Sequence, residues 1–332
     1  MRFSVQLAAA TIAIITLGHL LAYEYGAQQP VIFDAFATLF LAAAGFGGAA
    51  ALVCYVVYLG LKGVERPAVY LRQRLPEACS FAERRIAPTA LTFMFLGSFG
   101  TLKSLIPLLH PFAFDGTFSD LDRLIFGTDP WRLTHAIIGP AGTRVVDVIY
   151  GLWFAAWGFA VVFFGSFAAE EWRRRFLISF LIVWIVEGVI LATLLSSAGP
   201  CFLGLIGSPY AARYAALFPI DAPAAAGAQA MLAQSYRSGN VGAFLGISAM
   251  PSVHVGVAAL LVLAARPYGR WWTAAAALFW ASIFFGSVHL GWHYFVDGLL
   301  ATVVTAVIWV AVPHLHGRRT DKTQVALASA SS

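Results

Sequence analysis

Charged side chains are scarce in this chain of 332 residues. Asp, Glu, Lys and Arg make up 11% of it, where a soluble domain has about 25%. Apolar residues make up 60%, against about 45–50% in a soluble domain. So few charges cannot cover a water-soluble globule of this size, which excludes an ordinary soluble enzyme, a disordered protein and a nucleic-acid-binding module. We expect a polytopic membrane protein, in which the net charge of +5 reports orientation rather than a nucleic-acid partner.

Cysteine and asparagine are nearly absent as well. The three cysteines, Cys54, Cys79 and Cys201, are odd in number and follow no repeating spacing, so they predict neither a disulfide framework nor a zinc site. The single asparagine, Asn240, lies outside any glycosylation sequon. We also find no internal repeat.

Long apolar stretches dominate instead, and a membrane-spanning helix needs roughly 20 such residues. The sequence therefore predicts an all-α integral membrane protein with about eight spanning helices. The first stretch could also be a signal peptide, because Arg2 precedes it, but no small-x-small cleavage site follows and we favour a retained helix. The eight stretches are Val5–Tyr23, Val31–Leu61, Thr89–Leu109, Thr143–Ala169, Phe176–Ala198, Ser248–Ala265, Trp271–Leu290 and His293–Pro313.

These stretches suggest a division of the chain into four parts. Residues 1–62 would form two N-terminal spanning helices, and 63–88 an amphipathic segment on the cytoplasmic surface, centred on Pro67–Ile86. Residues 89–313 would form a six-helix core, and 314–332 a cytoplasmic tail. Two long segments of the core would lie at the outer face: Pro111–Ile138, an amphipathic segment rich in Asp, and the loop Gly199–Ile247.

Basic residues fall mainly on one side of the predicted membrane. Fifteen of the 21 lie before the first stretch, after the eighth, or in alternate loops between. The positive-inside rule makes this side cytoplasmic and places both termini there. Basic residues on the outer side need another explanation, and binding an anionic substrate is one. The six on or near the outer side are Lys103, Arg123, Arg132, Arg144, Arg213 and Arg237.

Polar residues at membrane depth are costly and tend to be functional. They gather at the predicted outer ends of the last three helices, in Ser248–His254 and Ser287–Asp297. The four-residue spacing of His293 and Asp297 puts both on one helix face. A carboxylate placed in this way can accept the proton of one imidazole nitrogen, which leaves the other nitrogen free as a nucleophile or base. His254 would supply a second imidazole, able to protonate a leaving group.

An anion could bind beside these histidines. Pro251 is favourable in the first turn of a helix, and the free backbone N–H groups that follow it would attract an anion. Ser252 adds a hydroxyl donor, and Arg213 and Arg237 could clamp phosphate oxygens from the long loop.

Together these motifs resemble a known family. Pro251-Ser252-Val253-His254 followed by His293-x-x-x-Asp297 resembles the second and third motifs of the type-2 phosphatidic acid phosphatase superfamily. Within it, the residues around both motifs look closest to the inositol phosphorylceramide synthase branch. The resemblance covers about Thr89–Pro313. The chain lacks the superfamily's Lys-x6-Arg-Pro motif and has Ser287 where an Arg is usual, so Arg213, Arg237 and Lys103 are our candidate replacements.

The resemblance implies a reaction and a role for each residue. His293 would attack phosphorus and become a phosphohistidine, Asp297 would orient it, and His254 would protonate the departing oxygen. No metal or other cofactor is implied. The partners would be a phospholipid donor and either a lipid alcohol such as ceramide or, in a lipid or polyprenyl phosphate phosphatase, water. The site would face the periplasm or exterior of a bacterial cytoplasmic membrane.

Three alternatives remain open at this stage. His289 lies four residues before His293, so His289, His293 and Asp297 could form a metal site with His254. Lys103 and Glu187, both inside predicted helices, could form an ion pair, because unpaired charges there are costly. A transporter would show internal repeats and helices broken at mid-membrane, and the sequence shows neither.

Overall fold

The computed structural model describes residues 2–25, 53–218, 220–239 and 245–316, and every regular element among them is a helix. The long helices are α1 (Arg2–Glu24), α3 (Pro67–Phe81), α4 (Ala87–Leu109), α7 (Pro140–Ser166), α8 (Glu170–Ile185), α12 (Val253–Ala265), α13 (Arg270–His289) and α14 (Phe295–His316). The shorter ones are α5 (Asp115–Phe126), α6 (Pro130–Ile137), α9 (Ala192–Leu194), α10 (Ala211–Tyr214) and α11 (Pro223–Arg237). The prediction of an all-α chain is confirmed for these residues.

Six helical stretches among the described residues are long and apolar enough to cross a membrane, as expected for an integral membrane protein. They match the first, third, fourth, fifth, seventh and eighth predicted stretches. The second, Val31–Leu61, lies mostly outside the described residues. The six are Phe3–Glu24, Val69–Leu109, Pro140–Ser166, Glu170–Leu194, Arg270–His289 and Phe295–Pro313.

The sixth predicted stretch forms a shorter helix than expected. Ser248–Ala265 was predicted to span, but α12 begins only at Val253 and has 13 residues. Pro251 disfavours the helical conformation in the residue before it, and the Ser252 hydroxyl accepts a hydrogen bond from the N–H of Val255 at 3.4 Å, which caps the helix there. The residues before Val253 are thus left outside the helix and lie at the end of the bundle where α14 begins.

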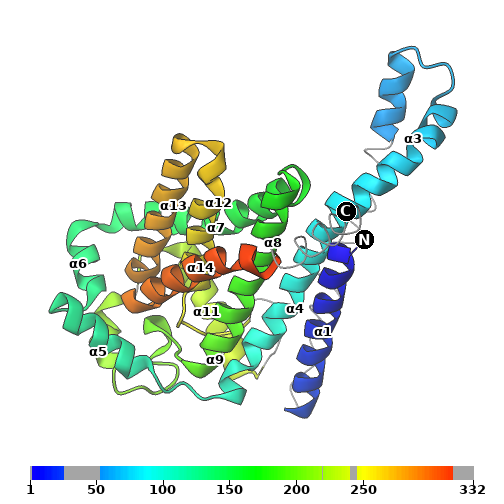
Figure 1. The fold of residues 1–332 in the computed structure, drawn as a ribbon. Coiled ribbons are helices and arrows are strands. Elements are labelled where there is room, and N and C mark those ends of the chain that lie inside the picture. The colour runs from blue at the N-terminus through cyan, green and yellow to red at the C-terminus, as the bar shows by residue number, and fades with distance from the viewer. Residues whose placement is uncertain (1, 26–52, 219, 240–244, 317–332) are drawn as a thin grey trace, which may run out of the picture.

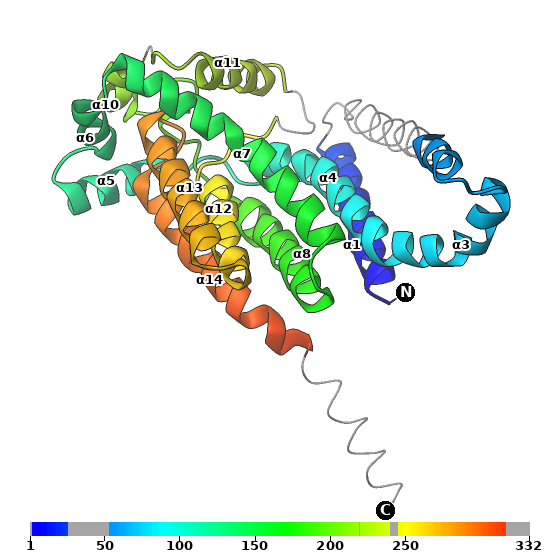
Figure 2. The ribbon, with the colours of Figure 1, turned by 90° about the horizontal axis from the view of Figure 1, so that it is seen from above.

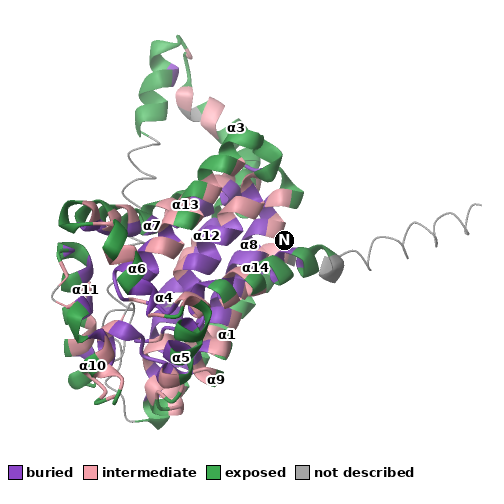
Figure 3. Ribbon diagram, turned by 90° about the vertical axis from the view of Figure 1, so that its left-hand side faces the viewer, coloured by how far each residue is buried: buried purple, intermediate pink, exposed green. Residues whose placement is uncertain are grey.

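Helix α12 lies at the centre of the bundle (Figure 3). It is apolar on every side, and most of its residues are buried, as expected of a helix surrounded by others. Around it pack α7, α8, α13 and α14, and the phenylalanines of α8, Phe176 and Phe180, are fully buried. The core therefore surrounds the helix that carries His254.

Glycines allow α8 to approach its neighbours closely, as is usual between membrane helices. Residues Val186–Leu191 at the end of α8 form a π-helical turn. A Cβ on Gly188 would collide with the ring of Phe99, and one on Gly256 of α12 would collide with the carboxylate of Glu187. Larger side chains at these glycines would push α8 away from α4 and α12.

Helices α1 and α4 lie side by side at the edge of the bundle, and α3 projects beyond them (Figure 1). The predicted surface segment Pro67–Ile86 is helical and mostly exposed. It is not separate from the next helix, because a π-helical turn, Ala82–Ile86, joins α3 directly to α4. Arg85 in this turn donates to the carbonyls of Ser166 and Ala168 and so fixes the start of α4 against the end of α7.

The short helices gather at one end of the bundle, where α5, α6 and α10 lie together and α11 lies beside α7 (Figure 2). The predicted amphipathic segment Pro111–Ile138 forms α5 and α6. Its aspartates do not simply face solvent, however. Asp115, Asp122 and Asp129 are buried, and two of them hold the ends of other elements, as described below.

Candidate active site

Two chain segments converge where α12 and α14 begin. His254 lies in the first turn of α12, His293 just before α14, and Asp297 in its first turn. Gly291 adopts a φ of 74°, which lets the chain turn sharply after α13. The N–H groups of Trp292 and His293 then both donate to the carbonyl of Ser287 at 3.0 Å. This turn places the His293 ring beside the segment before α12.

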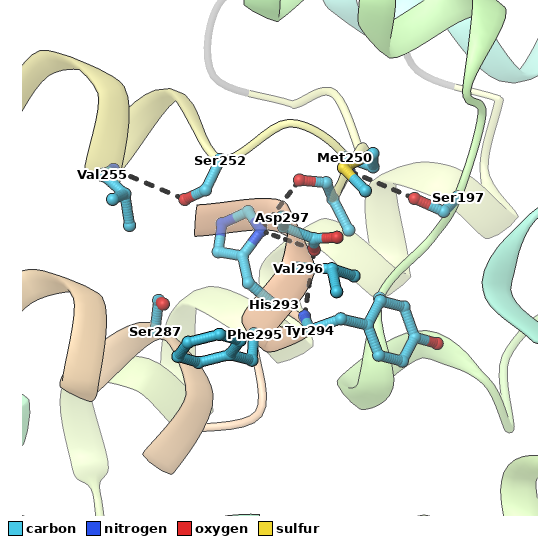
Figure 4. Close-up of polar contacts among 12 residues, drawn as sticks. Ser197, Met250, Ser252, Val255, Ser287, His293, Tyr294, Phe295, Val296 and Asp297 are labelled. Atoms are coloured by element: carbon cyan, nitrogen blue, oxygen red, sulfur yellow. Dashed lines mark hydrogen bonds and ion pairs between the residues drawn. The ribbon is translucent and has the colours of Figure 1, made fainter. Parts of the chain in front are cut away.

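His293 and Asp297 form the predicted pair (Figure 4). The Nδ1 of His293 lies 3.3 Å from Oδ2 of Asp297 and 2.9 Å from the carbonyl oxygen of Ala249. A carbonyl can only accept, so Nδ1 carries the proton and donates it. The same Asp297 oxygen accepts from the N–H of Tyr294 at 3.0 Å. The ring is therefore held in one tautomer, with Nε2 left unprotonated.

The surroundings of His293 favour the neutral ring. Its side chain is 8% exposed. Burial, and then the positive charge of Lys103, lower the pKa of His293 to about 3. A neutral imidazole with a fixed tautomer offers a nitrogen lone pair at physiological pH, which is what a nucleophile requires.

His254 lies next to His293, with 6.3 Å between ring centroids. Its ring stacks on Trp153 at 3.9 Å and on Tyr150 at 5.1 Å. Trp153 also donates from its indole N–H to the backbone carbonyl of His254 at 3.0 Å. These contacts with α7 hold the second imidazole beside the first, and both rings line the same cavity.

The four candidate phosphate-binding residues do not all come together. Lys103 lines the same cavity as His254 and His293. Ser252 is buried beside them, where its hydroxyl caps α12 and its N–H donates to the carbonyl of Asp297 at 3.3 Å. Arg237 is exposed at the end of α11 and does not line this cavity.

Arg213 has other partners. Its Nε lies 2.5 Å from Asp129, Nη1 lies 2.8 Å from Asp120, and Nη2 donates to the carbonyl of Ser119 at 2.9 Å. These contacts join α10 to α5 and α6. The geometry therefore indicates that Arg213 stabilises the short helices, and it does not place this residue at the cavity.

The hypothesis of an ion pair between Lys103 and Glu187 is wrong. Among the described residues, no carboxylate lies within ion-pair distance of Lys103. Glu187 is fully buried and accepts from the hydroxyl of Thr305 at 2.8 Å, and that hydroxyl also contacts the carbonyl of Gly256 at 3.2 Å. The glutamate thus links α8 to α12 and α14, while the lysine faces the cavity.

The contacts of His289 do not fit the hypothesis that it binds a metal ion. Its Nε2 lies 2.9 Å from the hydroxyl of Thr143 and its Nδ1 lies 3.0 Å from that of Thr134. The ring stacks on His135 with 4.1 Å between centroids. Both nitrogens are therefore engaged with hydroxyl groups of α6 and α7, not with His293 or Asp297. Within the described part of the chain, no three His, Cys, Asp or Glu side chains are placed to hold a metal ion.

We expect His289→Gln to lower stability more than activity. The change removes hydrogen bonds that are each worth about 1 kcal/mol, so the melting temperature in detergent should fall by a few degrees. Turnover of the folded enzyme should stay within about threefold. If His289 were a metal ligand, this variant would instead be as inactive as one that lacks His293.

Two buried carboxylates, to which the sequence analysis gave no role, bind backbone groups next to the site. Asp122 of α5 accepts from the N–H groups of Phe295 and Val296, at 2.7 and 3.0 Å, and so caps α14. Asp115 accepts from the N–H groups of Ala198 and Gly199 and from the hydroxyl of Tyr294. Burial raises the pKa of both, that of Asp122 to about 7. The only signal in the sequence was the density of Asp in an otherwise apolar segment.

A cavity of about 280 Å³ adjoins the two histidines. Its walls come from α4, α7, α8, α11 and the segment before α12. Few polar side chains line it besides the histidines, and the rest of the wall is apolar, with Phe99, Trp153, Trp184 and Phe202 among its residues. The polar ones are Lys103, Asp147, Tyr150 and Ser248. The site can therefore receive a molecule with one anionic end and one apolar end.

Comparison with known proteins agrees with this geometry. No curated protein and no solved structure is detectably similar to the chain. A model of the PAP2 superfamily matches residues 118–312, which is more than half of the chain and includes His254, His293 and Asp297. Helix α4, which carries Lys103, lies outside the match. On this evidence the chain belongs to the PAP2 superfamily.

Proposed function

We propose that the protein is a lipid phosphotransferase that works through a phosphohistidine. It would move a phospho-headgroup from a phospholipid to a lipid alcohol such as ceramide, at the extracytoplasmic face of a bacterial cytoplasmic membrane. The observation that carries this proposal is the buried His293–Asp297 pair with His254 beside it, at the end of an apolar cavity. Family membership supports phosphatase or phosphotransferase chemistry.

The reaction follows from the two imidazoles. Nε2 of His293 attacks phosphorus, a P–N bond forms, and the P–O bond to the donor's lipid alcohol breaks. His254, in its protonated form, gives its proton to the departing oxygen and becomes neutral. The acceptor hydroxyl then loses its proton to His254 and attacks phosphorus, and the P–N bond breaks. Asp297 and the Ala249 carbonyl keep the Nδ1 proton in place throughout, and Lys103 balances charge on the phosphoryl oxygens.

Transfer to a lipid is favoured over transfer to water by the surroundings of the nucleophile. The His293 side chain is almost wholly buried, and the cavity beside it is lined mainly by apolar groups. An intermediate there meets few water molecules, whereas a lipid alcohol can reach it with its chain in the apolar part. A lipid or polyprenyl phosphate phosphatase would use the same residues with water as the acceptor.

The test uses purified protein in liposomes that contain a panel of phospholipids, with and without ceramide or diacylglycerol. Products are identified by mass spectrometry. We expect a new headgroup-bearing lipid that forms only when the acceptor is present. Free phosphate or free phospho-headgroup without acceptor would indicate a hydrolase instead. Activity that is lost in EDTA and restored by a divalent metal would contradict the metal-free reaction.

A further inference from the structure

We propose that the cavity is a binding site for a single hydrocarbon chain of the substrate, which enters from the membrane between α4 and α7 beside Gly151. This inference deepens the proposed function and rests on it for the identity of the polar end. The structure supplies three observations: the polar and apolar groups of the cavity are separated, its depth is bounded, and one side is open.

Polar and apolar groups occupy opposite ends of the cavity. Lys103, His254 and His293 line one end of the cavity, and Leu96 and Trp184 line the other, while the ring of Phe154 meets that of His254 edge to face at 6.0 Å between centroids. Lys103 and Leu96 are seven residues apart on α4, as are Asp147 and Phe154 on α7, and seven residues of helix advance about 10 Å. A phosphate held near Lys103 would therefore direct its chain along the helices, toward the middle of the bundle.

Aromatic rings form the inner wall. Phe99 meets Trp184 edge to face with 4.8 Å between centroids, and Trp153 lies 6.0 Å from Trp184. These rings belong to α4, α7 and α8, so the wall is built by three helices packed on each other. Such a wall can pack against an alkyl chain but offers no partner for a second charged group.

The cavity opens sideways at α7. Gly151 and Phe154 line the cavity and are also exposed on the outside of this spanning helix, Phe154 by 51%. No atom lies within 4 Å of the place that a Cβ on Gly151 would take. Glycine here leaves a gap on the membrane-facing side of α7, at the level of His254, whose ring contacts both Tyr150 and Phe154.

Helix α11 closes the outer side of the cavity. Asp147 accepts from the N–H groups of Ala224 and Ala225 at 2.8 and 2.9 Å, and Gln229 donates to the carbonyl of Leu290 at 3.0 Å. The helix turns small side chains, including Ala228, toward the cavity. A hydrocarbon chain in the cavity would thus be covered by α11 and would enter from the bilayer.

Burial in this site should make binding depend on chain length. Each methylene moved from water into an apolar site strengthens binding about fourfold. The test measures the dissociation constants of ethylphosphonate and octylphosphonate by titration calorimetry, with the protein in lipid nanodiscs. We expect octylphosphonate to bind at least about a hundredfold more tightly to the unmodified protein.

Two variants fill the cavity from different walls, Gly151→Trp from α7 and Ala228→Trp from α11. The matched control is Gly158→Trp, seven residues further along the same face of α7, at a glycine that also has free space but does not line the cavity. Each phosphonate partitions into the bilayer to the same extent whichever variant is present, so differences between variants report binding in the cavity. Both filling variants should weaken octylphosphonate binding at least tenfold and leave ethylphosphonate binding unchanged.

The inference is overturned if neither filling variant differs from Gly158→Trp, or if both phosphonates lose affinity equally. Ethylphosphonate binding in the same variants shows that the phosphate end of the site is intact. Because this test measures binding, it is independent of turnover. If binding depends on chain length but no headgroup is transferred, the proposed function is contradicted and the hydrocarbon-chain site is still supported.

Discussion

His293→Ala is expected to abolish headgroup transfer, with a loss of at least about a thousandfold, because the attacking nitrogen is removed and no neighbour can replace it. His254 stacks between Tyr150 and Trp153 and has its own role in proton transfer. The measurement is the initial rate of product formation in liposomes, at equal amounts of folded protein.

The same variant provides a direct test of the covalent intermediate. Brief incubation with a donor labelled in its phosphate should leave acid-labile, base-stable label on the unmodified protein and none on His293→Ala. Asp297→Asn keeps the nucleophile but weakens its orientation, so it should label slowly, with turnover lowered about 10²- to 10⁴-fold. His19→Ala, on the peripheral helix α1, is the control and should label normally. Full labelling of His293→Ala would show that the covalent bond forms at another residue.

Much of the site could be predicted because its signals are local. The four-residue spacing of His293 and Asp297 predicted that the two side chains meet, and they do. The predicted shared helix face is wrong, however, because α14 begins only at Phe295 and a turn places the His293 ring. Pro251 indicated a helix start close to it, but α12 begins only at Val253, and Ser252, which we predicted as a donor to phosphate, caps the helix. Since apolar stretches alternate between membrane faces, the order of the helices also placed His254 and His293 at the same end.

The sequence did not reveal contacts between residues that are distant in the chain. Arg213 was predicted to bind phosphate because it is basic and on the outer side, yet its partners Asp120 and Asp129 lie more than 80 residues earlier. Glu187 was assigned to Lys103 by depth alone, whereas its partner Thr305 is 118 residues away. Hydropathy gives the depth of a residue in the membrane but not the face of the helix on which it lies, and these pairings depend on the face.

Lys103→Met is expected to lower turnover about 10²- to 10³-fold, equivalent to ~3–4 kcal/mol of lost transition-state stabilisation. The superfamily's usual cations are missing from their places in this chain, and Lys103 is the basic side chain that lines the cavity with both histidines. It has no carboxylate partner among the described residues, so its charge is available to an incoming phosphate. Methionine keeps the length and apolar contacts of the side chain and removes only the charge.

The matched control is Arg213→Met, which removes a cation that forms ion pairs with Asp120 and Asp129. It should lower the melting temperature and leave turnover of the folded protein within about threefold, while Lys103→Met should do the reverse. Lys103→Arg should recover part of the lost rate, because it restores a positive charge at the same wall of the cavity. If Arg213→Met were the inactive variant and Lys103→Met the active one, phosphate would be bound by the long outer loop, and the cavity would not contain the phosphoryl group.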